Sequence, residues 1–149
     1  MIAILQRVTS ASVDIDGERV AEIGKGFLIL LGVGRGDCES DADLLIGKIT
    51  KMRVFSDEND KMNLSVSDVG GEVLVVPNFT LYASYKKGNR PDYMNSAPPS
   101  EAKPLFEYFC DRMAELVPAE RGVFGADMKV SLVNDGPVTI PMDSSVLRK

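Results

Sequence analysis

The sequence MIAILQRVTSASVDIDGERVAEIGKGFLILLGV, residues 1–33, determines the fold class, because it reads as a series of strands joined by short turns. Its first half is rich in apolar residues and then alternates between apolar and polar side chains, which is typical of a half-buried strand. Asp16-Gly17 is a dipeptide typical of tight hairpins and precedes a second strand over residues 18–23. After a turn at residues 24–26, the continuous apolar run Phe27–Val33 predicts a buried central strand.

Two later segments have helical periodicity. Apolar residues recur at helical spacing at positions 42, 45, 46, 49 and 52. Ser40 or Asp41 is available as the N-cap of this helix. A second helix is predicted to begin after Ser100 as its N-cap and to tolerate Pro104 in its first turn.

The remaining apolar segments are strand-sized. Residues 72–76 are mostly β-branched, residues 126–133 alternate, and residues 138–142 follow the strong turn signal of residues 134–137. Because these strands do not alternate regularly with helices, a doubly wound parallel sheet is not expected. We predict an α+β fold in one compact domain over residues 1–149, with a mostly antiparallel, barrel-like sheet and two main helices.

Composition narrows the cellular setting. The chain has 44% hydrophobic and 26% charged residues, which is ordinary for a globular protein. No apolar run approaches the roughly 20 residues of a membrane span, and the N-terminus has no basic region typical of a signal peptide. Two cysteines, Cys38 and Cys110, do not make a disulfide framework, so a reducing cytoplasm is expected.

The chain contains no histidine, which excludes Ser-His and Cys-His nucleophilic sites and His-based zinc sites. Acid–base chemistry would fall to Asp, Glu, Lys, Tyr, a backbone group, water or the substrate itself. The formal charge of −5 argues against a general nucleic-acid coat protein, although a local basic patch can still steer binding. The candidate patch is Lys86, Lys87 and Arg90, in a long loop that is otherwise expected to be a solvated surface.

Two short motifs carry weak signals. GVGRGD, residues 32–37, follows a strand and precedes a helix, but it has neither the G-x-G-x-x-G pattern nor the Gly-Lys-Ser/Thr of a phosphate loop. Asp57, Glu58 and Asp60 lie close together, but their spacing is not that of an EF-hand. A tight turn and a solvated turn are the favoured interpretations, and no metal site is predicted.

Two other segments are more informative. In VLVVPNFTLYA, residues 73–83, Asn78 and Thr80 would share one face of a continuing strand and form a small polar site, or they would cap a turn. In SLVNDGPVT, residues 131–139, a Gly-Pro pair can present backbone carbonyls in an unusual direction, or it can simply turn the chain between strands. Spacing alone leaves both pairs of interpretations open.

Together with IAILQRVTSASV, GFLILLGV, FSDENDKMNLS, KGNRPDY and FGADMKVSLVNDGPVT, these segments resemble the D-aminoacyl-tRNA deacylase family, in its order and over nearly the whole chain. The resemblance implies a homodimer of a compact fold that hydrolyses the ester between a D-amino acid and the terminal adenosine of tRNA, in translation proofreading. It implies no cofactor or metal, and neither a membrane nor DNA as partner. It also implies that Gly136-Pro137 is cis and enters the active site of the other subunit.

The family motif, usually written Ser-Gln-x-x-Thr, aligns with residues 77–81, and direct alignment with the common family segment SQFTL places its threonine at Thr80. This chain has Pro77-Asn78 where the family usually has Ser-Gln. Asn carries the same amide groups as Gln but reaches one methylene less far. We therefore expect ester hydrolysis to persist, while substrate choice within aminoacyl-tRNA is open to a shift.

The resemblance suggests a mechanism without a protein base. The ribose 2′-OH of the substrate and a bound water would do the chemistry, while backbone N–H groups near Phe79–Leu81 stabilise the oxyanion. Asn78 and Thr80 would orient the adenosine or the water. Thr80 as a covalent nucleophile is the competing interpretation and lacks an evident base.

Steric rejection of L side chains at Gly136-Pro137 would give chirality selection and would let glycyl-tRNA through. Lys86, Lys87 and Arg90 would contact tRNA phosphates.

Two other classes of function remain as alternatives. A non-catalytic RNA-binding barrel would need exposed aromatic residues over a basic groove, but aromatic residues make up only 7% of this acidic chain. A general small-molecule esterase would normally show a G-x-S-x-G elbow and a histidine, and both are missing.

Overall fold

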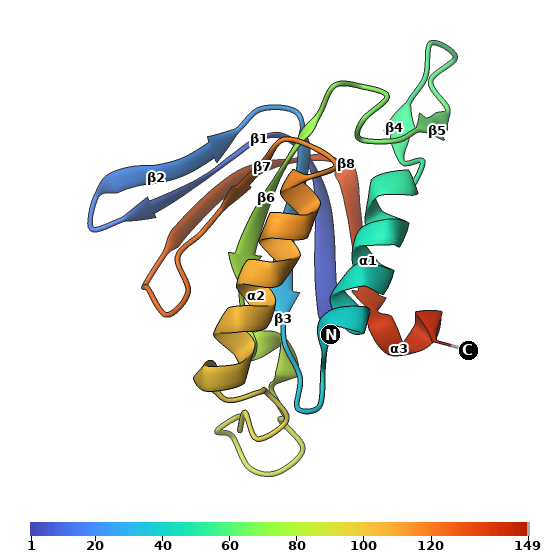
Figure 1. The fold of residues 1–149 in the computed structure, drawn as a ribbon. Helices are drawn as coiled ribbons and strands as arrows, with labels where there is room; N and C mark the ends of the chain where they lie inside the picture. The colour runs from blue at the N-terminus through green and yellow to red at the C-terminus, as the bar shows by residue number, and fades with distance from the viewer. Residues whose placement is uncertain (149) are drawn as a thin grey trace.

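The structure is a computed structural model that describes residues 1–148, and its long strands form one curved, barrel-like mixed sheet beside two main helices (Figure 1). The strands are β1 (Ile2–Ile15), β2 (Glu18–Ile23), β3 (Gly26–Gly32), β4 (Phe55–Ser56), β5 (Met62–Leu64), β6 (Glu72–Pro77), β7 (Ala119–Arg121) and β8 (Lys129–Asp143). The helices are α1 (Glu39–Lys51), the short 3-10 helix η1 (Phe79–Tyr82), α2 (Pro99–Ala114) and α3 (Ser144–Leu147). The predicted α+β class is confirmed.

Strand β1 organises the sheet because it pairs with three other strands. β2 and β3 lie antiparallel to β1 in one continuous register, in which Ile23 faces Ala11 and Gly26 faces Val8. The two strands are therefore one long strand interrupted at residues 24–25. The predicted hairpin is confirmed, since Asp16 and Gly17 both have positive φ, 51° and 80°, at the turn.

The far side of the sheet is parallel. β6 pairs with β3, and β7 pairs with β6, both in parallel, so the sheet order is β2-β1-β3-β6-β7, with β8 on β1. β3 is thus central, as its apolar sequence predicted. Alternate residues of β3 enter two different cores: Phe27 packs toward α1 and α2, whereas Leu28 packs with the strand residues of the curved end.

The helices cover one face of the sheet, as Figure 1 shows for α1 and α2. Their largest fully buried side chains are Leu45, Ile49, Phe106, Phe109 and Met113. Cys38, rather than Ser40 or Asp41, is the N-cap of α1, and α2 begins at Pro99 with Pro98 as N-cap, so the predicted Ser100 cap lies inside the helix. Proline suits this position because the first N–H groups of a helix have no intrahelical partner.

The largest departure from the predicted elements is β8. Residues 126–133 and 138–142 were expected as two strands around a turn, but β8 runs unbroken from Lys129 to Asp143 along β1. The register shifts where Gln6 faces Thr139 and Val8 faces Asn134, so residues 135–138 bulge out of the ladder. The turn chemistry of this segment therefore forms a bulge, because β1 holds the chain on both sides of it.

No helix within residues 1–148 is long and apolar enough to cross a membrane.

Alanine substitutions at two glycines should change the free energy of unfolding in opposite directions. A Cβ on Gly26, which has φ +157°, would lie 1.7 Å from the backbone oxygen of Glu72, whereas a Cβ on Gly47 in α1 meets nothing within 4 Å. We expect Gly26→Ala to lower the free energy of unfolding by about 2–4 kcal/mol through strain where β3 meets β6. Gly47→Ala should raise it by about 1 kcal/mol through helix propensity. Urea unfolding measures both, and equal effects of the two substitutions would contradict the described β3–β6 junction.

Candidate active site

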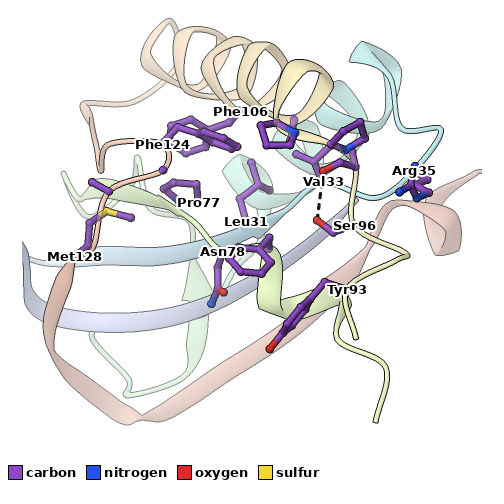
Figure 2. A pocket seen from close by; sticks show the side chains of 17 residues that line it. Leu31, Val33, Arg35, Pro77, Asn78, Tyr93, Ser96, Phe106, Phe124 and Met128 are labelled. Carbon is purple, nitrogen blue, oxygen red and sulfur yellow. Dashed lines mark hydrogen bonds between the residues drawn. The ribbon is translucent and has the colours of Figure 1, made fainter. Parts of the chain in front are cut away.

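A cavity of about 540 Å³ opens at the carboxyl ends of the parallel strands β3 and β6, beneath α2 (Figure 2). This edge of a parallel sheet is a common place for ligand sites. Its lining residues are Leu31, Val33, Arg35, Pro77, Asn78, Phe79, Tyr93, Ser96, Ala97, Pro98, Pro99, Ala102, Phe106, Phe124, Gly125, Ala126 and Met128. The walls are mostly apolar, with a few polar groups toward the mouth, and this combination suits a small organic ligand that has an aromatic part.

Asn78 and Thr80 form a cap and not a strand face. η1 begins directly after β6, and Asn78 is its N-cap. The Asn78 side-chain oxygen accepts a hydrogen bond from the Thr80 backbone N–H at 3.2 Å and a second one from the Thr80 hydroxyl. The capping-turn interpretation is therefore correct, and the strand-alternation interpretation is wrong, because the chain turns into a helix at Asn78.

The same cap decides which donors and acceptors remain free. The Thr80 hydroxyl proton is directed at Asn78, so the hydroxyl oxygen is left as an acceptor. The Leu81 N–H donates to the Asn78 carbonyl at 3.4 Å, and the Thr80 N–H donates to the Asn78 side chain. Of the backbone N–H groups of residues 79–81, that of Phe79 is therefore the available donor. The side chains of Phe79 and Thr80 are both exposed, and Phe79 lines the cavity.

Gly136 and Pro137 lie in the bulge of β8, away from the cavity of their own chain. Their peptide bond is cis, as the family resemblance implied, and both residues are exposed. Neither lines the cavity formed by the same chain. The structure therefore does not bring this pair together with Asn78 and Thr80 within one described chain.

Two side chains that the sequence did not single out hold the bulge in place. Arg7 on β1 donates from Nη1 to the Val54 carbonyl at 2.7 Å and from Nε to the Asp135 carbonyl at 3.1 Å. Asn134 spans the bulge from within β8, since its side-chain oxygen accepts the Val138 N–H at 2.9 Å. Arg7 could not be found from local sequence, because its partners are 47 and 128 residues away.

The basic loop lies beyond the mouth of the cavity. Lys86, Lys87 and Arg90 are exposed, and within the described residues they form no ion pair. Ser84 and Asp92 exchange backbone hydrogen bonds of 2.8 and 2.9 Å at the base of this loop, which projects past the end of the sheet in Figure 1. The long loop thus has a basic tip, while its C-terminal half supplies cavity residues.

The carboxylate of Asp57 organises the acidic turn. Asp57 accepts the N–H groups of Asn59 and Lys61 at 2.8 and 3.0 Å, which also lowers the pKa of its carboxyl. Over residues 1–148, no group of three or more candidate ligands could hold a metal ion. Asp57 therefore organises a turn, in agreement with the favoured interpretation.

The two cysteines have opposite environments. Cys38 is exposed, and its sulfur lies 3.0 Å from the Ser40 hydroxyl, a contact that lowers the pKa of the thiol. Cys110 is buried in α2, and burial raises the pKa of its thiol to about 12.

We expect iodoacetamide to alkylate Cys38 in the native protein and to spare Cys110, because the thiolate is the reactive form. The alkylation rate of Cys38 should level off at a lower pH than that of a free cysteine. Mass spectrometry of the modified peptides measures both sites, with urea-unfolded protein as the control in which both react. Equal native rates would contradict the described burial of Cys110.

Comparison with known proteins places the chain among tRNA deacylases. The family model described as D-Tyr-tRNA(Tyr) deacylase matches residues 4–143. The D-aminoacyl-tRNA deacylase of Persephonella marina is 54% identical over 147 residues, which are 99% of this chain and 100% of the relative. That of Vibrio cholerae is 57% identical over 139 residues, covering 93% of this chain and 96% of the relative.

Solved structures give the same fold. One described as c-Myc DNA Unwinding Element Binding Protein superposes with a TM-score of 0.91 at 38% identity, covering 96% of this chain and 98% of the other. One described as a probable eukaryotic D-amino acid tRNA deacylase has a TM-score of 0.80 at 15% identity, covering 95% and 98%. The second likeness concerns the fold alone.

Proposed function

The chain belongs to the D-Tyr-tRNA(Tyr) deacylase family and hydrolyses D-aminoacyl-tRNA, and from this premise we propose how its cavity performs and restricts that reaction. The cavity takes the terminal adenosine, and the ester carbonyl lies at the mouth beside η1. Water adds to the carbonyl carbon, the bond to the ribose oxygen breaks, and that oxygen takes a proton, which releases the D-amino acid and free tRNA. One observation carries this proposal: the apolar cavity ends at the Asn78–Thr80 cap.

The cavity suits a nucleobase. Phe106 and Phe124 give it aromatic walls, and Met128 adds a polarisable side chain beside them (Figure 2). Its volume of about 540 Å³ lies within the usual range of small-molecule sites. An unstacked base at the end of a single strand is the part of an RNA that proteins most readily bury against aromatic side chains.

The cap supplies polar groups at the reacting ester. The Phe79 N–H would stabilise the oxyanion, because the N–H groups of Thr80 and Leu81 are already bonded to Asn78. The Thr80 hydroxyl oxygen would accept a hydrogen bond from the attacking water or from the ribose 2′-OH. Thr80 is not the nucleophile in this proposal, since its proton is held by an amide oxygen, which is no base.

Gly136-Pro137 would select chirality from a second copy of the chain. The pair is exposed and lies outside its own cavity, so a gating role requires a homodimer in which it enters the partner's site. Arg7 and Asn134 hold its backbone in place, which suits a gate that acts by steric rejection. An L side chain would meet the gate, whereas a D side chain would point away and glycine would have nothing to reject.

The remaining proposals concern setting and substrate approach. Lys86, Lys87 and Arg90 would contact phosphates of the tRNA acceptor stem, because they are exposed cations near the mouth that lack described carboxylate partners. The chain would act in the cytoplasm as one deacylase domain in translation quality control.

A related deacylase with shifted specificity is the second candidate. Pro77 lines the cavity wall and Asn78 caps η1, at the two positions where the family usually has Ser-Gln. Both substitutions thus lie beside the bound substrate. This candidate predicts faster hydrolysis of another mischarged aminoacyl-tRNA than of any D-aminoacyl-tRNA.

The substrate assignment predicts a clear order of rates. Purified protein should deacylate D-Tyr-tRNA and Gly-tRNA rapidly and spare L-Tyr-tRNA, because only the L side chain meets the gate. Loss of label from matched aminoacyl-tRNA preparations measures the three rates, with spontaneous hydrolysis as the baseline. Equal loss of the D and L esters would overturn chirality selection, and loss of neither above baseline would overturn the catalytic assignment.

The role of Thr80 can be separated from that of a nucleophile. Thr80→Val should lower kcat roughly tenfold, the usual upper cost of one hydrogen bond between uncharged groups, and Thr80→Ser should restore it. Acid-quenched wild-type protein taken during turnover should show no acyl adduct by mass spectrometry. An aminoacyl adduct on the peptide that contains Thr80 would instead establish covalent catalysis.

A further inference from the structure

We propose that Arg35 and Tyr93 form a second subsite at the mouth of the cavity, which binds the nucleotide preceding the terminal adenosine: Arg35 holds the connecting phosphate, and Tyr93 stacks on the base. The inference rests on the proposed placement of adenosine in the cavity. It concerns a residue of the GVGRGD segment, which the proposed reaction otherwise leaves without a role.

Arg35 has the geometry of an anion-binding side chain. It lines the cavity and is exposed. Its backbone N–H donates to the Asn95 carbonyl at 3.0 Å, and its Nε donates to the Met94 carbonyl, so the guanidinium is held at one end only. Both terminal nitrogens remain as donors for a ligand.

The charge of Arg35 is not neutralised by the described residues. Arginines that pair with a carboxylate are Arg7, Arg19, Arg112, Arg121 and Arg148. Arg35 has no such pair within residues 1–148, and the carboxylate of Asp37, two residues later, accepts the Gly34 N–H at 2.6 Å. In a chain with a net charge of −5, a fixed cation without a carboxylate at a cavity mouth is a local preference for an anion.

The surrounding backbone keeps Arg35 in place. Gly34 and Ser96 form an antiparallel bridge, and the Ala97 N–H donates to the Val33 carbonyl at 2.9 Å. The segment before α2 is thereby joined to the end of β3. A guanidinium that is ordered before the ligand arrives loses little conformational entropy on binding.

Tyr93 offers a ring on the same rim. It lines the cavity and is 37% exposed, and Figure 2 shows it at the mouth, away from α2. The Phe79 ring meets it edge to face, with centroids 4.9 Å apart and planes at 76°, which fixes the orientation of the Tyr93 ring. An oriented, partly exposed aromatic ring is the usual platform for a single-stranded base.

A nucleotide is the ligand that explains both residues together. A phosphate follows directly on the 5′ side of the terminal adenosine, and a base follows that phosphate. Arg35 and Tyr93 line the same cavity that the adenosine would occupy, so both lie within reach of the strand as it leaves the mouth. Lys86, Lys87 and Arg90 on the neighbouring loop would meet the more distant phosphates.

Three substrates of increasing length test the subsite: D-Tyr esterified to adenosine, to the dinucleotide CpA, and to full tRNA. The wild-type protein should hydrolyse the D-Tyr ester of CpA with a higher kcat/KM than the D-Tyr ester of adenosine. Arg35→Ala should lower kcat/KM about tenfold on CpA and on tRNA, as expected for one lost charge-assisted contact, and leave the adenosine ester unchanged. Arg35→Gln, which keeps a donor for the Met94 carbonyl, should behave like Arg35→Ala if folding is intact.

Matched variants separate the contributions. Arg53 is also an exposed arginine without an ion pair in the described residues, so Arg53→Ala is the charge control and should leave all three substrates unchanged. Tyr93→Leu should lower kcat/KM roughly tenfold more on the CpA ester and on tRNA than on the adenosine ester, and Tyr93→Phe should restore it because the ring remains. Lys86→Ala/Lys87→Ala should affect tRNA alone.

The results that would overturn the subsite differ from the result that would overturn the proposed function. Equal losses in Arg35→Ala on all three substrates would overturn the subsite, because the residue would then act on the adenosine or the ester. No loss on any substrate would overturn it as well. If wild-type protein hydrolyses none of the three esters, the proposed function itself fails, whatever the variants do.

Discussion

The hydrogen-bond ladders on the two sides of β1 are the interaction on which the rest of the structure depends. One side carries β2 and β3 in continuous register and so places the carboxyl end of β3 at the cavity. The other side carries β8 and forces residues 135–138 out of the sheet. Arg7, from β1 itself, then holds the base of that bulge. One strand thus positions both the cavity wall and the exposed Gly-Pro pair.

This arrangement explains how a chain without histidine can serve as a hydrolase. An aminoacyl ester is already activated, so positioning and oxyanion stabilisation supply much of what it needs. In the proposed mechanism the Asn78 cap provides both, because it directs the Thr80 hydroxyl and leaves the Phe79 N–H free. In the same proposal, the aromatic cavity behind the cap places the substrate, and no ionised group of the protein takes part in the reaction.

Local sequence patterns predicted the elements whose structure is local. The Asp16-Gly17 hairpin, the buried strand of residues 27–33 and both main helices follow from turn chemistry and periodicity within a few residues. The bulge in β8 could not be predicted in this way, because a strand 120 or more residues earlier keeps the chain extended on both sides of Asn134–Pro137. The strand interpretation of Asn78 failed for a local reason: the Asn78 side chain caps a helix by bonding to Thr80, and this capping competes with strand alternation in a way that spacing alone does not decide.

The site shows the same division. Asn78, Phe79, Gly136 and Pro137 were predicted as site residues from motifs, and of these Asn78 and Phe79 line the cavity. The cavity residues Phe124 and Met128 gave no signal, since their neighbours come from β3, β6 and α2. The family resemblance supplied the function, and the fold shows that the two motifs lie apart within the described chain.

The most direct measurement is a crystal structure of the protein with a D-tyrosyl-adenosine amide, which mimics the ester but is not hydrolysed. We expect the adenine between Phe106 and Met128, the amide carbonyl beside the Phe79 N–H, and Gly136-Pro137 of a second copy facing the Cα of the D-amino acid. An adenine bound outside this cavity, or a complete site within a single chain, would contradict the central claim.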